Sequence, residues 1–395
     1  MERIGIYGGT FDPPHIGHIQ AAKQAIRELE LDRLLLIPSG NPHYKILSDS
    51  SANGQQRLQM LQIAFRDVPG IEVSDMEIRQ QDVHYTYETV LQVKHQHPDA
   101  QLVLLMGSDM FLKFDRWIHA DIIAENATLG VFFRGGKGEI AAVEQQKAIL
   151  AEKKIRGRLL HNDVIDISST QLRRMIAFHC ADPFLPDGIG EYIRKNHLYQ
   201  VDSDLHNLPM DELEAVVVSL LNPKRVAHVL GCRESAEELA KHWGADVTDA
   251  ARAGLLHDIT KALDGPLQLT LCHEYGTILD EFSHRYPKTL HALTGSLVAE
   301  RIFGENEAVC QAICHHTTGK ANMTLLEKII YIADYIEPNR TLPYVQELRH
   351  LAFTDLDGAV KMGLEKTLEH LATLGDEISP ATRQALDYLA GMANS

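Results

Sequence analysis

The chain has 395 residues, 45% hydrophobic and 23% charged, a balance typical of a globular protein with more than one domain. Its formal net charge of -16 excludes a general polyanion binder, because affinity for nucleic acid depends on lysines and arginines that neutralise phosphates. The five cysteines form no CxxC pair, and no apolar run approaches the roughly 20 residues that span a bilayer. We therefore expect a cytoplasmic protein with reduced thiols, no signal peptide and no membrane partner.

The first 200 residues alternate short apolar runs with amphipathic stretches such as Gly17–Leu29. This alternation predicts a mostly parallel, Rossmann-like α/β sheet that is covered by helices on both faces. The predicted strands are Arg3–Tyr7, Arg33–Ile37, Ile71–Val73, Gln101–Met106, Thr128–Phe133 and Asp163–Ile167.

The polar segment Val201–Pro209 predicts a linker, and the strand signals end after it. Residues 210–395 are therefore predicted to form a second domain, an all-α helical bundle, after an α/β domain at residues 1–200. Its predicted helices are Pro223–Trp243, Thr248–Lys261, Thr289–Phe303, Glu305–His316, Thr324–Glu337, Asp355–Leu374 and Pro380–Met392.

A glycine-rich turn, Gly8 to His18, separates the first predicted strand from the first predicted helix. Glycines let the backbone approach a phosphate closely, and the helix N-terminus supplies N–H groups and a positive dipole end. His15 and His18 are three residues apart, so both imidazoles can point at one phosphate. The turn therefore predicts a triphosphate site suited to adenylyl transfer, which needs positioning and well-aimed donors, with Mg²⁺ on the triphosphate.

A second polar element, Ser168-Ser169-Thr170, follows the last predicted strand and opens a helix. Its hydroxyls and N–H groups are expected to face the same phosphate pocket. Arg173 can offer a guanidinium fork to the β- or γ-phosphate.

The string GGTFDPPHIGH resembles the signature of the HxGH nucleotidyltransferase superfamily, and ISSTQLR is similar to the ISSTxxR element of bacterial nicotinate-nucleotide adenylyltransferases. The resemblance covers roughly residues 1–200. It implies transfer of AMP from ATP to nicotinate mononucleotide, giving nicotinate adenine dinucleotide and pyrophosphate in NAD biosynthesis, with His15, His18 and Arg173 as catalytic residues. The implied ATP-binding residues are Gly8, Gly9, Thr10, Phe11, His18, Gly107, Asp109, Arg134, Ser168, Ser169, Thr170 and Arg173.

The same resemblance implies a mononucleotide site of His43, Lys45, Tyr85, Thr86 and Trp117, with the indole stacked on the pyridine ring. The chain departs from the family at residues 133–136, where Phe-Arg-Gly-Gly replaces the usual Arg-Pro-Gly. Nicotinamide mononucleotide and phosphopantetheine stay open as alternative acceptors.

In the second half, His257-Asp258 lies in an apolar predicted helix, and further histidines and an aspartate lie on other predicted helices. Imidazole and carboxylate together suit first-row metals, and a buried aspartate is costly unless it is paired or ligated. The candidate metal ligands are His228, His257, Asp258, His291, His316 and Asp334.

The order H…HD…H…H…D resembles the HD-domain phosphohydrolases, and the strings GLLHDITK and IIYIADYIEPNR resemble the YqeK-type symmetrical diadenosine tetraphosphate hydrolases. The resemblance covers about residues 208–380. It implies a dinuclear iron or manganese site, in which His228, His257, Asp258 and Asp334 hold one metal and Asp258 bridges to a second metal at His291 and His316. A water shared by the metals would attack phosphorus and split diadenosine tetraphosphate into two ADP.

The same resemblance implies Asp258 and Lys261 as catalytic residues and gives Lys261 and Arg225 as groups that bind substrate phosphates. It favours His316 over its neighbour His315 as the ligand. Two alternatives stay open for the second half: a broader nucleotidase or alarmone hydrolase, and a nucleotide sensor without turnover. The expected partners are therefore ATP, nicotinate mononucleotide and diadenosine tetraphosphate, and the oligomeric state is left open.

Overall fold

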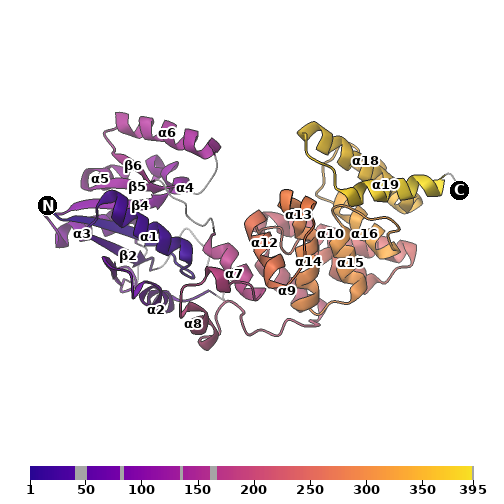
Figure 1. The fold of residues 1–395 in the computed structure, drawn as a ribbon, viewed down its shortest axis with the longest axis horizontal. Helices are drawn as coiled ribbons and strands as arrows, with labels where there is room; N and C mark the ends of the chain where they lie inside the picture. The colour runs from indigo at the N-terminus through magenta and orange to yellow at the C-terminus, as the bar shows by residue number, and fades with distance from the viewer. Residues whose placement is uncertain (41–50, 81–83, 134–136, 161–166, 394–395) are drawn as a thin grey trace. The chain divides into compact units, whose positions relative to one another are not determined.

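The computed structural model describes residues 1–40, 51–80, 84–133, 137–160 and 167–393 (Figure 1). The chain divides into two compact units, Met1–Asp202 and Ser203–Ser395, and the boundary lies at the start of the predicted linker. The first unit is α/β and the second is all-α, which confirms the predicted fold class. Among the described helices, none combines the length and the apolar character that a membrane crossing requires.

The first unit is built on a six-stranded sheet of order β3-β2-β1-β4-β5-β6, in which every neighbouring pair is parallel. The chain moves outward from β1 to β3 and then returns to β4 on the other side of β1, so the strand order reverses between β1 and β4. In open parallel sheets, ligands bind beyond the carboxyl ends of the strands at such a reversal. The strands are β1 (Arg3–Gly9), β2 (Arg33–Pro38), β3 (Ile71–Val73), β4 (Gln101–Gly107), β5 (Ala127–Phe132) and β6 (Gly157–Leu160).

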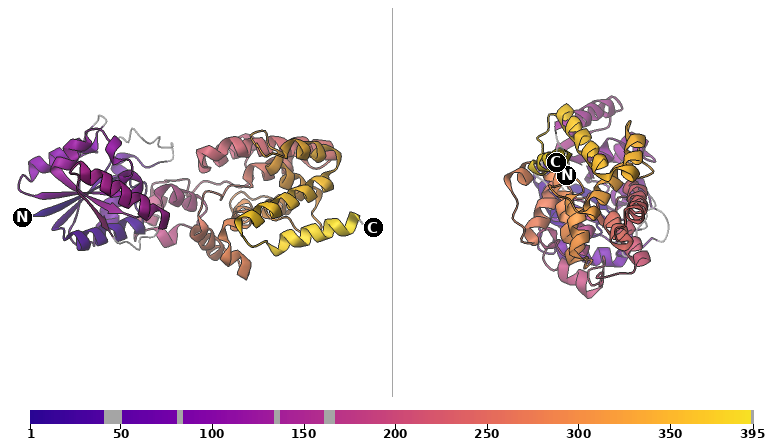
Figure 2. Two further views of the ribbon diagram at one scale, coloured as in Figure 1. Left: turned by 90° about the horizontal axis from the view of Figure 1, so that it is seen from above. Right: turned by 90° about the vertical axis from the view of Figure 1, so that its right-hand side faces the viewer.

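Helices cover both faces of this sheet, whose strands form a twisted fan in Figure 2. On one face, Ile4 and Ile6 of β1 and Leu104 of β4 belong to a buried cluster with Val90 and Val93 of α3. Strands that are buried on both faces in this way have continuous apolar sequences, and for this reason β1, β2 and β4 could be predicted from the sequence. The helices are α1 (Ile16–Leu29), α2 (Gly54–Phe65), α3 (Thr86–Gln96), α4 (Ser108–Phe111), α5 (Ala120–Asn126), α6 (Lys137–Glu152), α7 (Ser169–Ala177) and α8 (Ile189–Lys195).

The last strand differs from the prediction. The edge strand β6 lies at Gly157–Leu160, a short segment that carries one buried side chain and no apolar alternation. Of the predicted strand Asp163–Ile167, residues 163–166 lie outside the described residues, and Ile167 is buried but is not part of a strand.

The second unit is a bundle in which α10, α11, α15 and α16 pack together and α14 packs against α15 (Figure 1). Asn222 and Asp246 cap the N-termini of α10 and α11, and Gly244 ends α10 in the left-handed conformation. The helices are α9 (Met210–Leu220), α10 (Pro223–Trp243), α11 (Val247–Leu256), α12 (Gly265–Glu274), α13 (Glu281–Arg285), α14 (Leu290–Arg301), α15 (Glu307–His315), α16 (Leu325–Ile336), α17 (Val345–Thr354), α18 (Leu356–Leu374) and α19 (Pro380–Ala393).

Among the helix ends that were predicted too late, those of α11 and α15 carry candidate ligands. The predicted helix Thr248–Lys261 ends at Leu256, so His257 and Asp258 lie in the turn that follows α11. The predicted helix Glu305–His316 ends at His315, so His316 is the residue that caps α15. Tertiary hydrogen bonds hold the first of these turns, because Gln268 Nε2 donates to the carbonyl oxygens of Thr260 and Leu263.

Candidate active sites

The glycine-rich turn begins where β1 ends, at the reversal of strand order, and Gly107 ends the neighbouring strand β4. A Cβ atom added to Gly8 would meet no atom within 4 Å, so the end of β1 is open. A Cβ atom on Gly9 would lie 3.0 Å from the ring of Phe11, which is itself buried with a φ of 49°. The backbone is therefore accessible at Gly8 and tightly folded over the next three residues.

His15 and His18 lie together at the N-terminus of α1. His15 is the N-cap residue, and its ring centroid lies 3.6 Å from that of His18. The backbone N–H of His15 donates to Nδ1 of His18 over 3.1 Å. Since Nδ1 accepts this bond, neutral His18 carries its proton on Nε2 and can donate from there to a ligand.

The Ser168–Arg173 element packs directly onto this turn. Arg173 Nη1 donates to the carbonyl oxygen of Asp12 over 2.6 Å, and Ser169 Oγ donates to that of Pro13 over 3.0 Å. Ser168 caps α7 by accepting from the backbone N–H of Gln171. The two sequence motifs, 150 residues apart, therefore meet at the carboxyl end of β1, and Arg173 is anchored beside the histidine turn.

Three buried polar residues that were not predicted from the sequence hold this turn in shape: Asp12, Tyr199 and Arg57. Asp12 is fully buried, and its Oδ1 accepts from Tyr199 Oη over 2.6 Å and from the backbone N–H of Ala52 over 3.1 Å. Arg57 of α2 is 1% exposed and donates to the carbonyl oxygens of Thr10, Ser39 and Gly40. The signals in the sequence are an aspartate before Pro13 and an arginine on the apolar face of a helix.

We expect Arg57→Met to destabilise the first unit by about 2–4 kcal/mol, because it leaves three partly buried carbonyl oxygens without this donor. Urea unfolding of the full chain checks this. Arg66→Met is the matched control, since Arg66 follows the same helix, is mostly exposed and pairs with its neighbour Asp67. Its effect should stay within about 0.5 kcal/mol, and equal effects of the two changes would contradict the anchoring role of Arg57.

The residues predicted to bind the mononucleotide are only partly described. His43 and Lys45 lie outside the described residues, as does the predicted ATP ligand Arg134. Tyr85 is the N-cap residue of α3 and Thr86 is its first helical residue. Asp109 is exposed on α4, the short helix that begins directly after Gly107.

Trp117 follows the short helix η1 (Phe114–Arg116) and packs against Phe114, with ring centroids 5.5 Å apart. It lines a hollow of about 530 Å³ together with His119, Glu125 and Lys153. The described lining of this hollow includes none of residues 8–18.

In the second unit, four imidazoles converge on the carboxylate of Asp258, which is 1% exposed. Its Oδ2 lies 3.7 Å from Nε2 of His228 and 3.5 Å from Nε2 of His257. Its Oδ1 lies 3.5 Å from Nε2 of His291 and 3.7 Å from Nε2 of His316. Each carboxylate oxygen therefore faces a different pair of histidines, brought in from α10, α14 and the ends of α11 and α15.

All four rings are turned the same way, with Nε2 toward Asp258 and Nδ1 toward a fixed acceptor. A hydrogen bond at Nδ1 places the proton there and leaves Nε2 as the lone pair for a metal. The Nδ1 partners are Glu337 Oε1 for His228 at 3.1 Å, Gly254 O for His257 at 2.7 Å, Lys288 O for His291 at 2.9 Å and Ile313 O for His316 at 2.7 Å.

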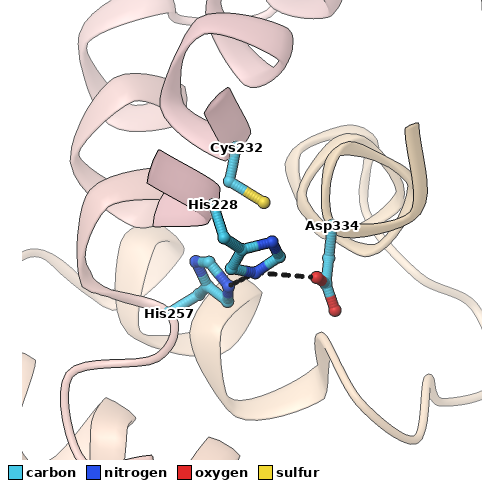
Figure 3. A group of neighbouring side chains, drawn as sticks. All are labelled: His228, Cys232, His257 and Asp334. Atoms are coloured by element: carbon cyan, nitrogen blue, oxygen red, sulfur yellow. Dashed lines mark hydrogen bonds and ion pairs between the residues drawn. The ribbon is translucent and has the colours of Figure 1, made fainter. Parts of the chain in front are cut away.

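Asp334 of α16 completes the cluster from the side of His228 (Figure 3), whose Nε2 lies 3.2 Å from Asp334 Oδ1. Burial alone would raise the pKa of Asp334, but the contact with His228 and the surrounding charges lower it well below its usual value. Arg340, which the sequence analysis did not select, donates to the same carboxylate. Asp334 is therefore ionised and available as a ligand.

Burial keeps three histidines of the cluster, His257, His291 and His316, neutral. It lowers the pKa of His257 and of His291 well below the usual value, and it lowers the pKa of His316 to about 4. Neutral imidazole is the form that binds a metal. A set of neutral imidazoles around two carboxylates fits first-row divalent ions, so the donor chemistry agrees with the predicted metal site.

Two predicted phosphate-binding cations lie beside the same carboxylate. Lys261 Nζ is 2.8 Å from Nε2 of His291 and 3.9 Å from Asp258 Oδ1, and burial lowers its pKa to about 8. Arg225, one turn before His228 on α10, bonds to Asp258 Oδ2. Positively charged side chains therefore lie beside the Asp258 carboxylate, and a polyphosphate can bind to them.

His315 and His316 are adjacent but face different ways, because His315 Nε2 bonds to Gln311 Oε1 at 3.2 Å. We expect His316→Gln to weaken metal binding by more than about tenfold, the lower end of what outer-sphere partners alone contribute. His315→Gln should leave the affinity unchanged. Equilibrium dialysis of the two variants with elemental analysis checks this. The reverse order of affinities would identify His315 as the metal ligand.

Both halves match known families. Residues 6–175 match the cytidylyltransferase-like family, and residues 225–339 match the HD domain family. A probable nicotinate-nucleotide adenylyltransferase of Neisseria meningitidis is 33% identical over 202 residues, which are 51% of this chain and 100% of that protein.

A protein of Mycoplasma pneumoniae joins both halves in one chain. It is named a probable nicotinate-nucleotide adenylyltransferase/Ap4A hydrolase and is 29% identical over 338 residues, 85% of this chain and 88% of its own. A solved structure from Clostridium acetobutylicum, described as a predicted HD superfamily hydrolase involved in NAD metabolism, has 38% identity, a TM-score of 0.46, and coverage of 47% of this chain and 98% of its own. The chain therefore belongs to the nicotinate-nucleotide adenylyltransferase family, fused to a C-terminal HD domain, as the sequence motifs predicted.

Proposed function

We propose that residues 1–200 transfer the adenylyl group of ATP to nicotinate mononucleotide. A phosphate oxygen of the mononucleotide attacks the α-phosphorus, the bond to the β-phosphate oxygen breaks, and pyrophosphate leaves with its Mg²⁺. The observation that carries the proposal is the pair of imidazoles at the first turn of α1, 3.6 Å apart, on a turn to which Arg173 is anchored. The name of the Neisseria relative supports the same reaction.

The residues of this turn act by holding and stabilising charge. Nε2–H of His18 donates to an oxygen of the α-phosphate as negative charge builds up there, and the first N–H groups of α1 add to the same effect. Arg173 binds the departing phosphates with the part of its guanidinium that does not contact Asp12. Tyr85, Thr86 and Trp117 are proposed to select the pyridine ring, with His43 and Lys45 on the phosphate of the mononucleotide.

We further propose that residues 210–395 hydrolyse diadenosine tetraphosphate to two ADP at a dinuclear metal centre. Asp258 would bridge the ions, because its two oxygens face two different pairs of histidines. His228, His257 and Asp334 would hold one ion, and His291 and His316 the other. Two divalent ions, iron or manganese, would supply an activated water for attack on phosphorus.

The other residues of this centre bind the substrate. Lys261 and Arg225 would bind the central phosphates of the substrate. Water would then attack one of the two phosphorus atoms that share the middle bridging oxygen, and the bond from that phosphorus to the bridging oxygen would break to give two ADP. The name of the Mycoplasma relative includes this class of substrate.

A panel of assays on the full chain tests both proposals. With ATP and Mg²⁺, nicotinate mononucleotide should react faster than nicotinamide mononucleotide or phosphopantetheine. With Fe²⁺ or Mn²⁺, diadenosine tetraphosphate should give ADP alone. Formation of ATP and AMP would exclude symmetrical cleavage, and tight binding of the dinucleotide without any product would identify the second unit as a nucleotide sensor.

A further inference from the structure

Cys232 lies one helical turn after His228 on α10 and points into the same cluster (Figure 3). Its side chain is 1% exposed. One ligand atom from each of His228, Cys232, His257 and Asp334 can be chosen so that all four lie within 4.8 Å of one another. Residues four apart share a helix face, so α10 presents an imidazole and a thiol to one point in space.

This spacing is close to that of donor atoms around one metal ion, to which the bridging Asp258 proposed above would add a fifth donor. Four donors at 2.0–2.3 Å from one tetrahedral ion lie about 3.3–3.8 Å apart, so a small inward movement of the side chains would bring them to ligating distance. The other cysteines show that this placement is specific. Among the described residues, Cys180, Cys272, Cys310 and Cys314 belong to no such group, although most of them are as buried as Cys232.

We propose that Cys232 is a ligand of the metal held by His228, His257 and Asp334, an inference that rests on the metal centre proposed above. On binding, the S–H bond breaks, a metal–sulfur bond forms and the proton leaves to solvent. The two metal positions of the second unit then differ in chemistry. The first has a thiolate and enough protein ligands to close its coordination.

Among the residues that the structure describes, the second position has nitrogen and oxygen donors and no sulfur donor; these come from Asp258, His291 and His316. A thiolate favours zinc, cobalt or ferrous iron over manganese and magnesium, whereas nitrogen and oxygen donors accept manganese. The first position is therefore a closed, selective site that fixes the histidine cage. The second keeps open positions for water and substrate.

Cobalt titration of the metal-free full chain tests the proposal, because a thiolate bound to Co²⁺ gives a charge-transfer absorption in the near ultraviolet. The wild-type chain should develop this band up to one equivalent of Co²⁺. Cys232→Ser and Cys232→Ala should lack the band and bind the first Co²⁺ at least about tenfold more weakly. Cys272→Ser, which changes another buried cysteine outside the cluster, should keep both the band and the affinity.

The outcomes separate this inference from the proposed function. Bound Co²⁺ and hydrolysis of diadenosine tetraphosphate without the band would overturn the role of Cys232 and leave the hydrolase proposal standing. A band that persists in Cys232→Ala would also overturn it. If the wild-type chain binds no Co²⁺ at all, the metal centre itself is wrong, and the role of Cys232 falls with it.

Discussion

Asp258→Asn is expected to lower the hydrolysis of diadenosine tetraphosphate by about 1,000-fold or more while adenylyl transfer continues. The asparagine has nearly the same shape, but its neutral amide offers one acceptor oxygen where the carboxylate offers two anionic ones. It cannot bridge the two ions proposed for this centre, because the histidine pairs that would hold them lie on opposite oxygens of Asp258. Loss of the bridge removes several kcal/mol of transition-state stabilisation, and each 1.4 kcal/mol is a factor of about ten in rate.

The measurement is the rate of ADP formation, with the metal content of the same sample determined in parallel. Metal content should fall together with the rate. Asp376→Asn is a suitable control, because Asp376 is an exposed carboxylate of the same unit. A parallel drop in adenylyl transfer would indicate general misfolding, and full hydrolysis in Asp258→Asn would remove the bridging carboxylate from the mechanism.

Periodicity and turn chemistry predicted the α/β unit and the helical unit because most of their elements are locally consistent. Strands β1, β2 and β4 are continuous apolar runs, and α10 has both a capping asparagine and a terminal glycine. The edge strand β6 has neither kind of signal, since only Leu160 of its four residues is buried. Its pairing depends on β5 beside it, a contact that a local pattern does not encode.

The ends of α11 and α15 were missed for a related reason. Ala250 to Lys261 keeps an apolar pattern, but the chain leaves the helix at His257 so that the imidazole and Asp258 enter the cluster. The hydrogen bonds that hold this turn come from Gln268 and from Thr260, which donates to the carbonyl oxygen of His291. These two candidate ligands therefore lie where tertiary contacts override helix propensity.

Candidate site residues were easiest to select when they repeat a chemical type along several predicted helices. The histidines and aspartates of the second unit met this condition. Arg57, Asp12 and Arg340 did not, because their role is visible only once their distant hydrogen-bond partners are placed around them. Cys232 has the right spacing from His228, yet a cysteine on a buried helix face is ordinary until Asp334 and His257 are seen beside it.

His18→Ala is expected to reduce kcat for adenylyl transfer by about 100- to 1,000-fold, the usual effect of removing one donor from a developing charge. His18 also supports the helix, because its Nδ1 accepts the N–H of the N-cap residue His15. His18→Gln separates the two roles. Glutamine at this position, the third of α1, can reach back to the same N–H as in a capping box, but it lacks the imidazole.

Comparison of these two variants therefore distinguishes chemistry from structure. His18→Gln should keep the thermal stability of wild type and still lose most of kcat, whereas His18→Ala should lose about 1 kcal/mol of stability as well. Hydrolysis of diadenosine tetraphosphate in the second unit provides the internal control and should stay unchanged in both. If His18→Gln restores transfer to the wild-type rate, then His18 acts through the shape of the turn, and the charge on the α-phosphate must be stabilised by His15 and the backbone of α1 alone.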